Sequence, residues 1–485
     1  MENRKNVLMI ATDHWPASLL GCAGHPTVMT PTLDQLSRDG IRFTNCYSTC
    51  PVCIPARRSL MTGMSPRSHG DRVYSDRMPM PDVTTFAQAF RNAGYQAYAV
   101  GKLHVYPQRS RIGFDDVVLM EEGRYDFGVV DDYQIWLGEN GYTGQEFLHA
   151  CGSNNYITRP WHLPEELHPT AFATRQMMHM IKRKDPTRPA FFYISYQFPH
   201  PPLVPLPEFW DMYDDAEIDM PEEDDWPKDA EVLRILGQMA GSYSEKEIRR
   251  ARRAFYAQCT YIDYSIRSLI GTLRESSLLK DTVIVFLSDH GDTLFDHGLV
   301  AKRTFYEGSA NVPLIITGAP VAPWRGQVSD RLACLEDVMP TVLSLCDVPV
   351  PETVEGIDLL HEEREEIFGE IGENKRATRM LRRGPYKLIW YPCGNRKQLF
   401  QVDEDPGEHH DLAGKPEYAE VLRDLEDRLA GYLHGCDEEW VRDGKLAGYP
   451  EEPFVPAPDY ELYNQRGYHW PPPGGYTNIG TDIRK

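Results

Sequence analysis

The stretch Thr282–Gly291 reads TVIVFLSDHG. Its first residues are mostly β-branched or apolar and predict a buried strand, and an aspartate and a histidine follow directly. The stretch Asn6–His14, NVLMIATDH, has the same form near the N-terminus. Apolar strands of this kind are typical of a parallel sheet covered by helices, so these two stretches indicate an α/β fold.

The same alternation of short apolar runs with amphipathic stretches continues along the chain. We predict further strands at Tyr95–Gly101, Ala190–Tyr196 and Val312–Thr317, and helices at Thr32–Arg38, Thr85–Asn92, Ala171–Lys184, Glu245–Leu273 and Leu335–Leu345. Gly40 and Gly94 follow two of these helices, where a left-handed cap favours glycine. Residues 1–365 are therefore expected to form one α/β domain with a large mixed, mostly parallel sheet flanked by helices.

The pattern changes at about residue 366. Short strands are predicted at Glu366–Gly369, Thr378–Leu381, Tyr386–Tyr391 and Gln398–Gln401, with a helix at Tyr418–His434. We therefore expect a smaller C-terminal α+β lobe over residues 366–436. Residues 437–485 are rich in tyrosine, tryptophan and proline, and we expect an extended arm that packs on a neighbouring subunit of a homo-oligomer. An arm folded back on its own chain is the alternative.

The composition of the 485 residues excludes several classes of protein. A net charge of −21 argues against nucleic acid or an anionic membrane as the main partner. No apolar run approaches the roughly 18 residues of a membrane span, and the N-terminus lacks a secretory signal, so we expect a cytoplasmic protein. Most of the ten cysteines are accordingly expected to be reduced and buried.

Polar side chains follow four of the predicted strands. In open α/β sheets the active site lies at the carboxyl ends of the strands. A single such residue is equally well a cap or a core residue, but their coincidence at one edge predicts a site for a metal and an anion. The residues concerned are Asp13, His14, Lys102, His104, His200, Asp289 and His290.

The segment Cys50–Gly63, CPVCIPARRSLMTG, carries a candidate nucleophile. Pro55 suits the first turn of a helix and places Cys53 near the helix N-terminus, where the helix dipole favours an anionic oxygen or a thiolate. Arg57 lies four residues later and therefore on the same helical face. A buried structural cysteine beside a surface arginine is the alternative. A lone CxxC at residues 50–53 is a weak signal for redox chemistry or zinc.

This segment resembles the signature of the type I sulfatases, C-x-P-x-R followed by T-G, in which the cysteine is oxidised to formylglycine. Four further elements resemble motifs of that family in the same order along the chain, and the resemblance spans roughly residues 5–415. The four are Gly101–His104, Phe198–His200, Ser288–Gly291 and Lys302, and a fifth stretch, Gln398 to Leu412, resembles the end of the family's smaller lobe.

The resemblance implies a role for each candidate residue. A formylglycine hydrate derived from Cys53 would attack sulfur, Arg57 would stabilise the hydrate, and His104 would act as the base for its collapse. Lys102 and Lys302 would neutralise the sulfate oxygens, and His200 or Lys302 would protonate the leaving oxygen. The implied metal ligands are Asp13, Cys53, Asp289 and His290, with His14 as a further candidate. Ca²⁺ is the expected ion and Mn²⁺ the alternative, because imidazole is a poorer partner for Ca²⁺.

Two positions depart from the pattern of many family members. His14 stands where many have a second aspartate, and His290 where many have asparagine. Phosphonate monoester hydrolases of the same alkaline phosphatase superfamily also lack that aspartate, but they lack the Lys-x-His element that this chain has at 102–104. We therefore expect a sulfate ester hydrolase, with a phosphate or phosphonate ester hydrolase and an inactive sulfated-glycan-binding relative as alternatives.

The expected substrate is a sulfated carbohydrate, and an aryl sulfate or choline sulfate is the alternative. Residues 106–165 and 201–242 look like long loops of the kind that select substrates. Their tryptophans could stack on sugar rings or serve as plain hydrophobic anchors; these are Trp136, Trp161, Trp210 and Trp226. The other partner that the resemblance implies is a formylglycine-generating maturation enzyme.

Overall fold

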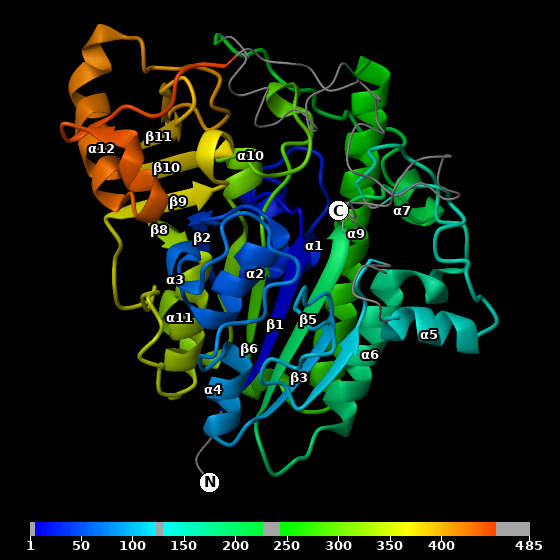
Figure 1. Ribbon diagram of the computed structural model, residues 1–485. Coiled ribbons are helices and arrows are strands. Elements are labelled where there is room, and N and C mark those ends of the chain that lie inside the picture. The colour runs from blue at the N-terminus through cyan, green and yellow to red at the C-terminus, as the bar shows by residue number, and fades with distance from the viewer. Residues whose placement is uncertain (1–4, 123–129, 153, 227–242, 453–485) are drawn as a thin grey trace.

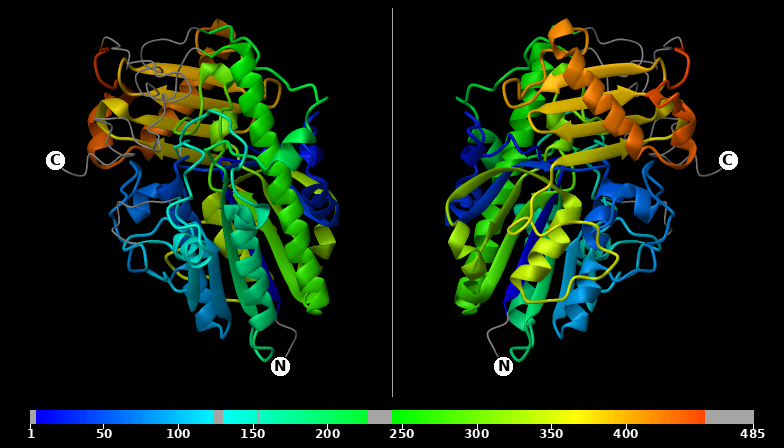
Figure 2. Two further views of the ribbon diagram at one scale, coloured as in Figure 1. Left: turned by 90° about the vertical axis from the view of Figure 1, so that its right-hand side faces the viewer. Right: turned by 90° about the vertical axis from the view of Figure 1, so that its left-hand side faces the viewer.

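The computed structural model describes residues 5–122, 130–152, 154–226 and 243–452. These residues form a large sheet between two layers of helices, with a smaller lobe stacked beyond one end of the sheet (Figures 1 and 2). The carboxyl ends of the central strands point toward this smaller lobe (Figure 1). The expected arm begins at residue 437, and its part from residue 453 on lies outside the described residues.

Within the described residues the large sheet has eight strands in the order β4-β3-β5-β1-β6-β7-β2-β8. All neighbouring pairs are parallel except those made by β7, which runs antiparallel to both β6 and β2. The fold is therefore the predicted mixed, mostly parallel sheet. Its strands are β1 (Asn6–Asp13), β2 (Gly40–Tyr47), β3 (Gln96–Gly101), β4 (Asp116–Leu119), β5 (Ala190–Pro199), β6 (Thr282–Ser288), β7 (Leu314–Thr317) and β8 (Gln327–Cys334).

The central strands are apolar on both faces because helices cover both faces. Leu8 and Ile10 of β1 belong to the core shared with α1 (Pro31–Asp39), α6 (Pro169–Arg183) and α9 (Glu245–Glu275). The alternate residues Val7 and Met9 belong to the core on the opposite face. The helices of that second face are α2 (Cys53–Thr62), α4 (Phe86–Asn92) and α11 (Val338–Leu345).

The smaller lobe is an antiparallel sheet with the strand order β12-β11-β10-β9 and a helix, α12 (Ala419–Tyr432), on one face (Figure 2). Leu388 and Leu399 face α12, whereas Met380 and Phe400 on the other side of the sheet belong to the core of the large domain. Its strands are β9 (Glu366–Ile371), β10 (Thr378–Arg383), β11 (Tyr386–Tyr391) and β12 (Arg396–Gln401). The hairpin of β13 (Val441–Arg442) and β14 (Lys445–Leu446) packs on the same lobe through Leu446.

Three details differ from the expectations. Gly40 is not a left-handed cap: it opens β2 with φ −139°, and a Cβ there would lie 2.1 Å from the carbonyl oxygen of Ile316, so close strand packing requires the glycine. The segment 106–165 is not all loop, because it contains β4 and α5 (Asp132–Glu139). The strands β2, β4 and β8 escaped prediction, because β2 and β8 interrupt their apolar residues with polar ones and the short β4 has only its last residue buried.

The remaining short helices are α3 (Pro66–His69), α7 (Pro207–Asp211) and α10 (Glu307–Ala310). No helix in the described ranges is both long enough and apolar enough to cross a membrane. All ten cysteines lie in these ranges as free thiols, and eight of them are buried. Cys50 and Cys53 are therefore two separate thiols rather than a disulfide.

Candidate active site

Helix α2 presents Cys53 at its first residue. The helix begins there because Val52 is extended, and the backbone N–H of Ala56 donates to the Val52 carbonyl at 3.0 Å. The helix ends at Gly63, whose φ of +66° is the left-handed cap conformation. Every residue of α2 is buried, so Cys53 and the positive end of the helix dipole are held in a rigid, water-poor position.

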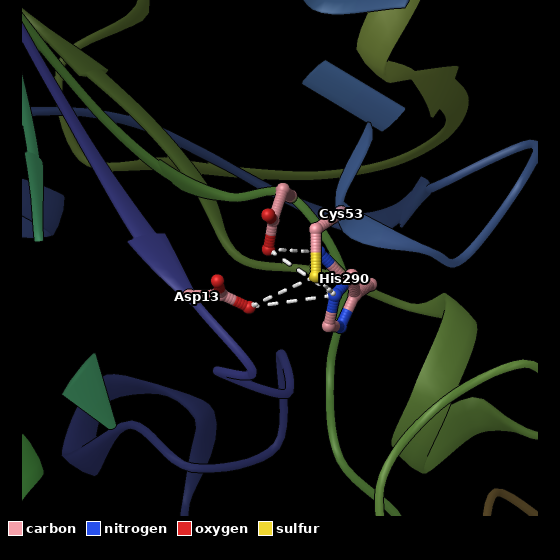
Figure 3. A group of neighbouring side chains, drawn as sticks. Asp13, Cys53 and His290 are labelled. Atoms are coloured by element: carbon pink, nitrogen blue, oxygen red, sulfur yellow. Dashed lines mark hydrogen bonds and ion pairs between the residues drawn. The ribbon is translucent and has the colours of Figure 1, made fainter. Parts of the chain in front are cut away.

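Four potential ligand side chains meet at the carboxyl ends of β1 and β6 (Figure 3). Ligand atoms of Asp13, Cys53, Asp289 and His290 all lie within 4.8 Å of one another, and all four residues are buried. Nε2 of His290 lies 3.2 Å from Sγ of Cys53 and 3.4 Å from Oδ1 of Asp13. His290 Nδ1 lies 2.9 Å from the carbonyl oxygen of Gly291 and donates to it, which leaves Nε2 facing the cluster.

Arg57 ties this cluster to neighbouring strands. Its Nε donates to Oδ2 of Asp289 at 2.8 Å, and its Nη1 donates to the Lys102 carbonyl at 2.9 Å and to Oγ of Ser195 at 2.6 Å. Nη2 lies 3.6 Å from Oδ2 of Asp13. Among the described residues this buried Nη2 has no hydrogen-bond partner, so it is an available donor for an anionic or hydroxyl oxygen placed beside Cys53.

Lys102 and His104 follow β3 as predicted. The Lys102 ammonium is completely buried and donates to the carboxylates of Asp13 and Glu122. His104 lies beside Glu122 and its neighbour Glu121, with Nε2 3.9 Å and 3.7 Å from their carboxylates. Its backbone N–H also donates to Glu121 at 3.1 Å. Lys102 therefore links the carboxylate of β1 to the segment that follows β4.

A second group surrounds Lys302. Its Nζ lies 2.6 Å from Nε2 of His14 and 3.1 Å from Nε2 of His200. Nδ1 of His14 lies 2.6 Å from Asp292, which also accepts from the Tyr156 hydroxyl. Nδ1 of His200 lies 2.6 Å from the Pro201 carbonyl. In both imidazoles Nδ1 carries the proton and donates it to an oxygen acceptor, so the Nε2 lone pair of each accepts from Lys302.

Burial and charge set the protonation of these groups. Burial and the Lys302 ammonium lower the pKa of His14 well below its usual value, and burial lowers the pKa of His200 to about 3. Burial alone would raise the pKa of Asp13, but Lys102 and the neighbouring imidazoles hold it well below its usual range. Burial and Asp13 also raise the pKa of the Cys53 thiol, yet Lys302, Lys102 and His290 together bring it below its usual value.

The donor set fits a divalent metal. Two carboxylates and one imidazole converge with the Cys53 position. In each carboxylate one oxygen accepts from a cationic side chain, Lys102 for Asp13 and Arg57 for Asp289, and the other oxygen faces His290. Oxygen-rich sets suit Ca²⁺, whereas the imidazole suits Mn²⁺. His14 lies near the same Asp13 oxygen, with Nε2 3.8 Å from Oδ1, but it groups with His200, and its Nε2 is 2.6 Å from Lys302.

The structure thus brings all the predicted site residues to one edge of the sheet, but sequence reasoning missed four residues that hold them. Glu122 follows β4, a strand that was not predicted, and Asp292 lies two residues beyond His290. The strand-end rule that identified Asp13 would have indicated Glu122 if β4 had been recognised. Ser195 of β5 and Tyr156 carried no local signal, because only the fold brings them to Arg57 and Asp292.

The four loop tryptophans are packed within the protein. Trp161 and Trp226 are each 6% exposed. The guanidinium of Arg175 lies 5.1 Å from the ring of Trp136, and that of Arg253 lies 4.0 Å from the ring of Trp210. Trp161 lines a small cavity beside the Lys302 group, together with Glu122, Glu146, His149, Gln197 and Phe198. Trp161 and Trp226 are therefore buried, whereas Trp136 and Trp210 are only partly buried against the core.

Comparison with known proteins agrees with this geometry. The family model described as Sulfatase matches residues 5–348, and the model described as N-sulphoglucosamine sulphohydrolase, C-terminal, matches residues 295–434. An arylsulfatase of Clostridium perfringens is 33% identical over 472 residues, which cover 92% of this chain and 98% of that protein. A choline-sulfatase of Rhizobium meliloti is 30% identical, over 85% of this chain and 83% of that protein.

A solved structure shows the same fold. The phosphonate monoester hydrolase of Agrobacterium radiobacter superposes with a TM-score of 0.77, over 88% of this chain and 95% of that one. Its sequence identity to this chain is 21%, so the likeness concerns the arrangement of the sheet, the helices and the smaller lobe.

Proposed function

The chain belongs to the sulfatase family and is a sulfuric ester hydrolase, and on that premise we propose that its nucleophile derives from Cys53. The observation that carries this proposal is the position of Cys53 at the N-terminus of α2, 3.2 Å from His290 and beside Asp13 and the available Nη2 of Arg57. The sequence around it, Cys53 to Arg57, has the C-x-P-x-R form. We further propose that a maturation enzyme oxidises Cys53 to formylglycine.

The oxidised residue would supply what a thiol lacks. A formylglycine hydrate has two geminal hydroxyls, so one can attack sulfur and the other can later expel sulfate by collapse to the aldehyde. Arg57 Nη2 is placed to donate to a hydroxyl on residue 53. His104 is the proposed base for the collapse, and the carboxylates of Glu121 and Glu122 lie 3.7 and 3.9 Å from its Nε2.

Lys302 is the proposed acid for the leaving alcohol. Two of its three N–H donors are directed to His14 and His200, and among the residues that the structure describes the third remains for a substrate oxygen. His14 and His200 are held neutral, so neither competes with the lysine for the role of proton donor. Lys102, which donates to Asp13, would neutralise charge on the sulfate oxygens.

We propose that Asp13, Asp289, His290 and residue 53 hold the metal, which is Ca²⁺ in preference to Mn²⁺. When bound, such an ion polarises a sulfate oxygen and acidifies a neighbouring hydroxyl. Exhaustive chelation is expected to lower kcat by at least about 100-fold, and Ca²⁺ is expected to restore it. Metal content is measured by elemental analysis alongside activity. Full activity in the chelated enzyme would show that the cluster works without a metal, and restoration by Mn²⁺ alone would assign that ion.

The proposed substrate class is a sulfated carbohydrate. Its support is the match of residues 295–434 to the N-sulphoglucosamine sulphohydrolase C-terminal model, a region that contains Lys302. Because of the choline-sulfatase and arylsulfatase relatives, choline sulfate and aryl sulfates are the other esters to be compared. Because of the structural likeness to a phosphonate monoester hydrolase, hydrolysis of phosphonate monoesters is the competing reaction.

A matched set of substrates tests the proposal. We expect kcat/KM for an aryl sulfate to exceed that for the corresponding aryl phosphonate monoester by at least about 100-fold. A sulfated glucosamine is expected to be turned over faster than choline sulfate. Preference for the phosphonate would overturn the assignment to sulfate, whereas preference for choline sulfate would change only the substrate class.

A further inference from the structure

A second cluster of metal-ligating side chains lies away from the active-site cluster, where three segments of the chain meet. Oδ1 of Asp224 lies 2.9 Å from Nδ1 of His297 and 3.0 Å from Nδ1 of His409. The side chains of Asp224 and His297 are only 2% and 4% exposed, and that of His409 is 16% exposed. Their ligand atoms all lie within 4.8 Å of one another.

From this geometry we propose that Asp224, His297 and His409 form a zinc site. Two imidazoles and one carboxylate are a common protein ligand set for Zn²⁺, with a fourth position for water or another group. Bonds of about 2.0–2.1 Å in a tetrahedron separate ligand atoms by about 3.3 Å, so the two contacts of Asp224 Oδ1 with the imidazoles need to open by only a few tenths of an ångström. Glu222 lies on the other side of the His409 ring, with Oε2 3.7 Å from Nε2, where a carboxylate can orient a ligating imidazole.

The backbone holds Asp224 and His409 in place. The N–H of Asp225 donates to the His409 carbonyl at 2.9 Å, and Nε1 of Trp226 donates to the Glu408 carbonyl at 2.9 Å. Gly407 makes room for the imidazole, because a Cβ at that position would lie 2.2 Å from Nε2 of His409. The ligands on the long loop and on the smaller lobe are therefore positioned by contacts that the metal does not have to create.

His297 is presented at the tip of a tight hairpin. Its φ of +57° is unusual for a residue other than glycine, and the hairpin is closed by the N–H of Phe295 donating to the Leu299 carbonyl at 2.7 Å. The rings of Trp226 and Tyr306 lie 5.3 and 4.6 Å from the His297 ring and form an apolar wall beside it. An apolar wall of this kind limits water access and strengthens metal–ligand interactions.

The hairpin connects this cluster to the active site. At its base, the backbone N–H groups of Leu294 and Ala301 both donate to Oδ1 of Asp292 at 2.9 Å, and Lys302 follows directly. A metal at His297 would therefore fasten the segment that carries Asp292 and Lys302 to the smaller lobe. The role that follows is structural, because the ligands lie at the far end of the hairpin from the proposed proton donor.

The test compares His409→Gln with His410→Gln in the full-length protein. A glutamine amide can still donate to Asp224 but is a poor zinc ligand, so this change keeps the hydrogen bond and removes the metal site. His410 is adjacent in sequence, 61% exposed, and paired with Asp405 instead. Zn²⁺ bound per chain is measured by equilibrium dialysis and elemental analysis, with Ca²⁺ in excess.

We expect His409→Gln to bind one Zn²⁺ fewer per chain than wild type, and His410→Gln to match wild type. A ligand that binds only the native state raises the free energy of unfolding, and Zn²⁺ is added at 100 times its Kd for this purpose. The Tm should therefore rise in wild type and in His410→Gln but not in His409→Gln. Asp224→Asn serves as a second variant in case His409→Gln folds poorly. Equal zinc binding by wild type, His409→Gln and Asp224→Asn would show that the cluster is held by hydrogen bonds alone.

Discussion

Cys53→Ala is expected to lower kcat/KM for a sulfate ester by at least about 10⁴-fold and to leave the fold intact, since loss of a catalytic nucleophile has effects of this order. The thiol is small and buried at the first residue of α2, and the helix begins through backbone contacts of Val52 and Ala56 that alanine preserves. The measurements are steady-state kinetics and the far-UV circular dichroism spectrum. Mass spectrometry of the peptide containing residue 53 shows whether the wild-type side chain has become an aldehyde.

Cys50→Ala is the matched control. Cys50 is also buried and lies three residues earlier, outside the C-x-P-x-R segment. It should keep activity within about tenfold of wild type, because removing one buried sulfur costs mainly packing energy. Turnover by purified Cys53→Ala at a rate near that of Cys50→Ala would refute a nucleophile at position 53 and leave the metal cluster to act on water.

The central part of the fold could be predicted because its strands are buried on both faces. The strands β1 and β6 have continuous apolar runs, and their ends supplied Asp13, Asp289 and His290. The strands β2 and β8 mix polar with apolar residues, and the short edge strand β4 has only its last residue buried, so none of the three shows a long buried apolar run. Missing β4 also meant missing Glu122, the carboxylate that shares Lys102 with Asp13.

Pairings between distant segments could not be predicted. The contact of Lys302 with His14 joins residues 288 positions apart, and His409 meets Asp224 across 185 positions. Each of these residues follows a turn or a strand end. The residue pattern around it therefore does not indicate which distant residue it contacts. The sequence predicts which edge of the sheet carries the chemistry, whereas the choice of partner depends on how the loops pack.

Arg57→Ala is expected to cost both stability and activity. The change leaves Asp289 and Ser195 buried without their donor, and breaking a buried ion pair costs about 3–5 kcal/mol of unfolding free energy. It also removes Nη2, the donor proposed to hold a hydroxyl on residue 53, so kcat/KM should fall by at least about 10³-fold. Denaturant unfolding measures the first effect, and kinetics normalised to the folded fraction measure the second.

Arg58→Ala separates these two effects. Arg58 is buried beside Arg57, but its guanidinium donates to the carbonyls of Met78 and Pro79 at 2.8 and 2.6 Å rather than to a carboxylate of the active site. Its loss should therefore reduce stability while kcat/KM of the folded enzyme stays within about tenfold of wild type. Because Arg57 also lies in the maturation signature, the aldehyde content at residue 53 is measured in both variants. If matured Arg57→Ala were as active as Arg58→Ala, the guanidinium would be a structural tie between α2 and β6 and would have no part in the reaction.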